Sequence, residues 1–381
     1  MSEAGKLDAS ARALLKRAAP GRAEFEDLVV VPVFAVIVAL ILGALTMLAT
    51  DVDLATIGRS YVALLKGSVG SLNALSETLT AAFPLVLAGL GLALGFRAGL
   101  FNIGAEGQLL MGGLAAVVVG FSLPGLPAVL LLPLCLLAGA VTGAAYASIA
   151  GVLRAYTGAH EVISTIMLNL ISYRLLDYLL RQPFVQLPGR SDPISKSVPP
   201  NAALPRLLDW IEPNLRVHAG LVLMLIAVAA VWWLLFRTKL GFELRASGEN
   251  PDAARYAGMR ASLIIVLAMA IAGALAGLAG ANQVLGVLGR ASPGFSAGIG
   301  FDAIAVALLG RSHPVGVLLA GLLFGALEAG GRQMQIDAGV SVDLIGIIQA
   351  LIIVFIAAPL LVRAIFPWGF ARDRKAGEGR K

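Results

Sequence analysis

Seven polar side chains lie inside stretches that are otherwise apolar; besides Glu328 and Gln349 there are five, and these five are the residues of this chain best suited to chemistry. Three are amides, Asn102, Gln108 and Asn169, and two are carboxylates, Glu106 and Asp302. An amide can orient a neutral polar ligand without a counter-charge, whereas a carboxylate in an apolar medium needs a partner or access to water. Each of the five could instead cap a broken helix, so a ligand-binding role and a structural role both remain open.

Most of these side chains lie in or beside two glycine-rich stretches, 95–108 and 289–300, that interrupt the apolar pattern. Each stretch has an Arg-Ala pair, then an aromatic residue, then two glycines, with Arg97 and Phe101 in the first and Phe295 in the second. Irregular backbone is tolerated at membrane depth where it lines a cavity, so the stretches are predicted to line a transport pathway. Their aromatics could stack on a base or sugar face, or could simply pack between helices. The alternative is a pair of re-entrant turns that only pack helices closely.

Composition indicates a polytopic membrane protein. Of the 381 residues, 58% are hydrophobic and only 14% are charged, which is far more apolar than a soluble globular domain. The net charge of +6 comes mainly from basic residues beside the apolar runs, where they set topology, so we expect no nucleic-acid binding. The single cysteine, Cys135, excludes an intrachain disulfide, and the three histidines lack paired metal-ligand spacing, so we expect no metal and no cofactor.

The apolar runs predict an all-α fold with about ten transmembrane helices, each near the length needed to cross a bilayer, in a permease domain over 28–363. Basic residues at the ends of the runs place 1–27 and 364–381 in the cytoplasm and make 181–217 an outer loop. Residues 50–77 are expected to form an outer connection. With about five spans in each half, the two halves would run in opposite directions, as inverted repeats with broken helices do.

The most polar island in the second half of the chain is 237–260, with five basic and three acidic residues. It must therefore lie in water. Asn250 and Pro251 begin a short helix, Asp252 complements its positive end and Gly258 closes it. A helix of about two turns is not stable alone, so a docking element for another protein and an ordinary cytoplasmic loop remain as alternatives.

No segment of the chain has the GxxxxGK[ST] pattern of a nucleotide-binding P-loop. The chain is therefore not expected to be an enzyme that hydrolyses nucleotide. A transporter of this kind draws its energy from an ion gradient or from a separate ATPase subunit. A capped helix between two membrane blocks favours the second source.

Five motifs together resemble the permease subunits of bacterial ABC importers, in the branched-chain amino acid/ribose-type family and its simple-sugar and nucleoside branch. They are GFRAGLFNIGAEGQLLMGG (95–113), LRAYTGAHEVISTIMLN (153–169), GFELRASGENPDAARYAGM (241–259), GFDAIAVALLGRSHPVG (300–316) and VDLIGIIQALIIVF (342–355). The resemblance covers nearly the whole chain beyond residue 80. The family pattern has asparagine where this chain has His160 and Ser312, which bears on substrate preference or local capping.

The resemblance implies a multi-pass protein of the bacterial inner membrane that transports nucleosides or a related simple sugar. Its partners would be membrane lipid, an ABC ATPase subunit, a substrate-binding lipoprotein and a second related permease, with the pore between the two permease chains. The coupling region, 238–260, would sit in a cleft of the ATPase through Glu243, Arg245, Glu249, Asn250, Pro251, Asp252, Arg255, Tyr256 and Gly258. The substrate pathway is expected to include Arg97, Phe101, Asn102, Glu106, Gln108, Asn169, Phe295 and Asp302.

Two other functions remain open. The chain could be an ion-coupled secondary transporter that uses Glu106 or Asp302 as its proton or sodium site. It could also be a membrane scaffold that transports nothing. The many polar residues inside its spans disfavour the scaffold.

Overall fold

A computed structural model describes residues 31–341 and 343–357, so the expectations for 1–27 and 364–381 lie outside the described residues. The described part is helical and contains two isolated β-bridges but no strand. The chain divides into two compact units, one of residues 59–339 and one that contains the described parts of 1–58 and 340–381. The fold is thus all-α, as the apolar runs predict.

The smaller unit contains helices α3 (Val31–Ala49) and α15 (Asp343–Ala357), which pack against each other. Val38 of α3 and Phe355 of α15 are buried in this contact. Helix α4 (Leu54–Val69) begins in this unit and ends in the larger one. Residues 50–77 were expected to be a connection, but they contain α4 and the first turn of the next helix. Ser71 begins that next helix, since its side chain accepts from Ala74 N at 3.0 Å.

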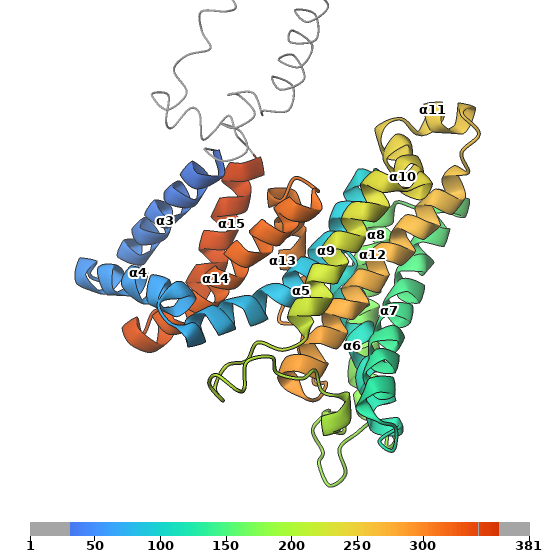
Figure 1. Ribbon diagram of the computed structural model, residues 1–381. Coiled ribbons are helices and arrows are strands. Elements are labelled where there is room, and N and C mark those ends of the chain that lie inside the picture. Colours follow the sequence, from blue (N-terminus) through green and yellow to red (C-terminus); the bar gives the residue numbers. More distant parts are fainter. Residues whose placement is uncertain (1–30, 342, 358–381) are drawn as a thin grey trace, which may run out of the picture. The chain divides into compact units, whose positions relative to one another are not determined.

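The larger unit is a bundle drawn in Figure 1. Seven of its helices, counted among the described residues, are long and apolar enough to cross a membrane. The helices of the unit are α5 (Leu72–Arg97), α6 (Ala105–Ser122), α7 (Ala128–Val152), α8 (Glu161–Leu180), α9 (Gly220–Arg237), α10 (Lys239–Glu249), α11 (Pro251–Tyr256), α12 (Ala261–Gln283), α13 (Ile299–Leu309) and α14 (Pro314–Ala338), with π-helical turns Leu153–Thr157 after α7 and Val284–Leu288 after α12.

The bundle has two distinct ends (Figure 1). Helices α10 and α11 lie at one end, here called the α10 end, and residues 181–219 lie at the other, here called the loop end. Helix α5 is buried along most of its length, and α12 packs against α5, α6 and α7. These four helices form the core that positions the polar residues.

Residues 181–219 are tied to the loop end by hydrogen bonds. Ser195 N donates to Ala291 O at 2.9 Å, which joins this segment to the chain that follows α12. His218 is fully buried, and this burial, with the nearby Arg216, lowers the pKa of His218 to about 4. The imidazole is therefore neutral at physiological pH.

Three helices of the core meet at glycines. Gly112 of α6, Gly139 of α7 and Gly277 of α12 lie so close that a Cβ on Gly139 would be 3.1 Å from Gly277 O and 3.2 Å from Gly112 O. A Cβ on Gly277 would collide with Gly139 O. Small residues at such crossings let backbones of membrane helices approach closely, so the packing of α12 depends on them.

We predict that Gly277→Ala lowers the free energy of unfolding by about 1–3 kcal/mol, because the added methyl group forces α7 and α12 apart. Gly346→Ala is the matched control, since a Cβ on this exposed glycine of α15 meets nothing within 4 Å. The control should be neutral or slightly stabilising, as alanine favours a helix more than glycine does. Thermal unfolding of both purified variants in one detergent checks this, and equal midpoints would contradict it.

Candidate functional site

The Glu106 carboxylate joins the first turns of α6 and α13. Glu106 is only 1% exposed, and its Oε2 accepts a hydrogen bond from Gly300 N at 2.8 Å. Its Oε1 accepts from Ser296 Oγ and, at 3.4 Å, from the hydroxyl of Tyr173 on α8. One side chain thus connects the two broken stretches and a third helix.

Helix N-termini explain why a carboxylate is tolerated here. The first N–H groups of a helix have no partner within it, and the helix dipole favours negative charge at this end. Glu106 lies in the first turn of α6 and accepts from the first turn of α13. Gly300 is required at this contact, because a Cβ there would lie 2.7 Å from Glu106 Oε2 and closer still to the Glu106 backbone.

Asn102 and Gln108 form a closed pair beside this carboxylate. Asn102 Nδ2 donates to Gln108 Oε1 and Gln108 Nε2 donates to Asn102 Oδ1, both at 3.1 Å. Asn102 Oδ1 also accepts from Gly104 N at 2.9 Å, which stabilises the turn that enters α6. Both side chains are 1% exposed.

Asn169, a buried residue of α8, binds the same turn from the neighbouring helix. Its Oδ1 accepts from Gly107 N at 2.9 Å and its Nδ2 donates to Ile103 O at 2.8 Å. One turn earlier on α8, Thr165 Oγ1 accepts from Ile103 N at 3.2 Å. Asn169 lies about 12 Å along α8 from Glu161, so the irregular backbone that it stabilises is well inside the bundle.

Of the other predicted pathway residues, Phe295 and Asp302 lie close to this polar core, and Arg97 and Phe101 lie apart from it. The Phe295 ring is buried against Gly113 of α6. Phe101 is 39% exposed and stacks on Phe96 at a centroid distance of 5.0 Å. Arg97 Nε donates to Ser312 O at 3.1 Å, at the α10 end, and Asp302 is half-buried in α13. A contact of any of these eight residues with substrate stays a prediction.

The coupling region, 238–260, contains two helices. Helix α11 has the predicted boundaries: Asn250 Oδ1 accepts from Ala253 N at 3.0 Å, and Gly258 follows with a φ of 82°. Helix α10 was not predicted, and Thr238 Oγ1 caps it by accepting from Gly241 N at 3.0 Å. The region therefore has both a packed helix and an exposed one.

Helix α10 is clamped to the segment after α5. A Cβ on Gly248 would lie 2.8 Å from Gly99 N and 2.9 Å from the Ala98 carbonyl carbon, and would collide with Arg97 O. Gly99 has a φ of 72°, which favours glycine. The coupling region is thus in direct backbone contact with the stretch that carries the polar core.

The predicted coupling residues divide between the two helices. Arg245 of α10 packs on α9, with its guanidinium 5.4 Å from the Phe236 ring centroid. In α11, Asp252 and Arg255 form a surface ion pair at 3.8 Å, and Tyr256 is 94% exposed. On α10, Glu243 pairs with Lys239 at 3.6 Å. Glu249 and Pro251 are both exposed.

Sequence reasoning missed four residues of the polar core, which are Thr165, Tyr173, Ser296 and Gly300. Thr165 and Tyr173 are ordinary polar residues one turn from Asn169 on α8, and Ser296 directly follows Phe295. Gly300 was singled out only as part of a glycine-rich stretch. Nothing in the sequence shows that it faces Glu106.

We predict that Glu106→Gln keeps the free energy of unfolding within about 1 kcal/mol of wild type, because one amide oxygen still accepts from Gly300 N and the Ser296 hydroxyl can reorient. Glu106→Leu should lower it by about 1–3 kcal/mol for each buried donor left without an acceptor. Thermal unfolding and solute uptake are to be measured on both. If Glu106→Gln folds normally but transports nothing, the carboxylate acts in ion coupling rather than in holding the two helices.

Comparison with known proteins agrees with this architecture. A family profile described as "Branched-chain amino acid transport system / permease component" matches residues 74–357. The guanosine ABC transporter permease protein NupP of Bacillus subtilis is 40% identical over 88% of this chain and 94% of its own length. No solved structure matches the chain.

Two further relatives cover similar shares. The glucose ABC transporter permease protein TsgB13 of Haloferax volcanii is 39% identical over 91% of each chain. The nucleoside ABC transporter permease protein NupB of Lactococcus lactis is 36% identical over 93% of this chain and 96% of its own. The family profile covers most of the chain, and these relatives match it nearly end to end. The chain therefore belongs to the permease family of branched-chain amino acid transport systems.

Proposed function

We propose that this chain is the permease subunit of a bacterial ABC importer that moves nucleosides, or a related simple sugar, across the inner membrane. The observation that carries this proposal is the end-to-end similarity to permease proteins named for guanosine, nucleoside and glucose transport. A nucleoside and glucose are both neutral and hydroxyl-rich. The energy comes from a separate ATPase subunit, in keeping with the lack of a P-loop in the sequence.

We further propose a topology of about ten spans in two inverted halves with both termini in the cytoplasm. The positions of the two breaks support it. The first break follows Arg97 at the α10 end, and the second contacts Ser195 at the loop end. Inverted repeats require such opposite placement. In this topology the α10 end faces the cytoplasm and residues 181–217 face outward.

The proposed ATPase contact is made by α11, with α10 carrying the motion inward. Helix α11 is exposed and well capped, and it lies at one end of the bundle (Figure 1). Helix α10 touches the backbone of Gly99 through Gly248. Closure of the ATPase would therefore displace the segment that leads into the polar core.

The complex is proposed to contain a second related permease and a substrate-binding lipoprotein. The surface of helix α8 is consistent with a second permease, since it has exposed apolar residues on the side away from the core. They are Ile163, Met167, Leu170 and Ile171. In the pore proposed between two permease chains, this side faces the second chain or lipid. The lipoprotein would deliver solute at the loop end.

The alternative of an ion-coupled carrier is less well supported. The Glu106 oxygens accept hydrogen bonds from the protein itself, and the relatives are named as ABC permeases. Asp302 remains half-buried in α13 without such a set of donors in the described residues. A proton-driven carrier would stop when an uncoupler is added at constant ATP, whereas an ATP-driven importer would continue.

We predict that Tyr256→Ala lowers the affinity for the ATPase by at least about tenfold, because an exposed aromatic at the centre of an interface is a typical hot spot. ATPase co-purification and ATP-dependent guanosine uptake should fall together. The stability of the chain should not change, since this side chain is 94% exposed. Tyr178→Ala, an exposed tyrosine at the loop end of α8, is the control. Undiminished co-purification with Tyr256→Ala would contradict the docking assignment.

A further inference from the structure

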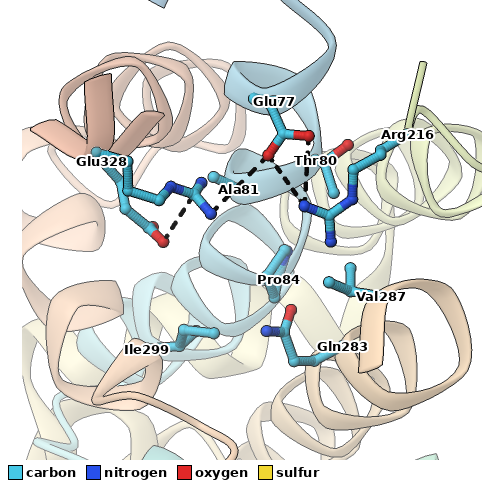
Figure 2. A pocket seen from close by; sticks show the side chains of 10 residues that line it. Glu77, Thr80, Ala81, Pro84, Arg216, Gln283, Val287, Ile299 and Glu328 are labelled. Carbon is cyan, nitrogen blue, oxygen red and sulfur yellow. Dashed lines mark hydrogen bonds and ion pairs between the residues drawn. The ribbon is translucent and has the colours of Figure 1, made fainter. Parts of the chain in front are cut away.

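A pocket at the loop end lies outside the polar core around Glu106. It is bounded by α5, α12, α13, α14 and Arg216, and its empty volume, which includes the open space at its mouth, is about 320 Å³ (Figure 2). One part of its wall is apolar, formed by Pro84, Val287 and Ile299. The rest is polar, with Thr80 and Gln283 beside four charged side chains.

The four charged side chains balance one another. Glu77 accepts hydrogen bonds from Arg216 Nη1 at 3.3 and 3.1 Å, and Arg332 Nη1 lies 3.9 Å from Glu77 Oε2. Arg332 Nη2 lies 3.8 Å from Glu328 Oε1. Two carboxylates and two guanidinium groups give the wall no net charge. Such a wall favours a neutral occupant over an anion or a cation.

Thr80 supplies an independent sign of a ligand. It is 5% exposed, and its Oγ1 is buried without a hydrogen-bond partner. A threonine inside a helix usually donates to the carbonyl one turn before it, and a buried hydroxyl without a partner costs free energy. The Thr80 hydroxyl is therefore available to a group inside the pocket.

The pocket has a route to the surface. A larger pocket, about 1150 Å³ with its open mouth included, shares Glu77, Arg216 and Arg332 with it and has both polar lining residues, such as Asn73 and Gln333, and apolar ones, such as Ile336. The ion pairs of Glu77 therefore stand between an outer pocket and an inner one. The enclosed part of the inner pocket is only about 40 Å³, smaller than a sugar ring, so these pairs must separate to admit a solute.

We propose that the inner pocket binds the hydroxyl groups of the sugar part of a neutral solute on its way through the permease. The carboxylates accept from hydroxyls, and the guanidinium, Thr80 and Gln283 groups donate to them. The apolar wall suits the C–H face of a sugar ring. This inference rests on the proposed function. It places in the permease a binding site for a sugar, the part that a nucleoside and glucose have in common.

The first test uses Gln283→Cys in the whole complex, labelled with a membrane-impermeant thiol reagent. The only native cysteine, Cys135, is buried, so the wild-type chain gives the background. Guanosine and glucose should slow labelling at least about threefold, whereas the free base guanine, which has no sugar, should not. Ser122→Cys, at the exposed end of α6 on the loop end and outside the lining of this pocket, is the control whose labelling no solute should change.

The second test asks whether the Thr80 hydroxyl contributes. Thr80→Val keeps the shape of the side chain and removes the donor. In the Gln283→Cys background it should raise the guanosine concentration for half-protection by about threefold to tenfold, the effect of one neutral hydrogen bond. Thr142→Val, on α7 and away from this pocket, should leave that concentration unchanged.

The outcomes separate this inference from the proposed function. If the wild-type complex takes up guanosine or glucose but neither protects the introduced thiol, the pocket is only a structural ion-pair network. Equal protection by guanine, or a thiol that no reagent reaches, would also overturn the subsite. If the complex takes up neither solute, the proposed function itself fails.

Discussion

The Glu106 carboxylate accepts hydrogen bonds from residues 190 and 194 positions further along the chain, and this is the constraint on which the site depends. It holds two helix N-termini together inside the bundle, where their first N–H groups would otherwise lack acceptors. A carboxylate at this depth would be costly alone, but two helix dipoles and three donors stabilise it. Gly300 follows from the same contact, since the backbones are too close for a side chain.

The remaining polar contacts extend this constraint in both directions. Asn102 and Asn169 satisfy the backbone of the turn that enters α6, and Gln108 holds the Asn102 side chain. That turn continues through Gly99 to the backbone of Gly248 in α10. A continuous path of close contacts thus runs from the proposed ATPase surface to the middle of the bundle. Its rigidity is what would let a small movement of α11 change the site.

Much of the fold could be predicted because helix signals are local. Asn250 and Gly258 end α11 on its two sides because their own side-chain and backbone properties favour those positions, and the apolar runs locate the long helices. Helix α10 was missed because Gly241 and Gly248 oppose a helix locally, and only packing explains them: Gly241 lies against Leu234 and Leu235 of α9, and Gly248 against the end of α5. The pocket around Glu77 gave no signal because its residues come from distant segments. His160 is the residue before α8, and Ser312 has a φ of 52°, two kinds of position that favour asparagine.

The central claim is that α10 transmits motion through its contact with Gly99, and Gly248→Ala tests it most directly. ATP hydrolysis and guanosine uptake would be measured on the same reconstituted complex. We expect the ATPase still to bind and to hydrolyse ATP, because α11 is untouched, while uptake per ATP falls by about tenfold, equivalent to about 1.4 kcal/mol. Unchanged uptake per ATP would show that the stroke reaches the pathway by another route.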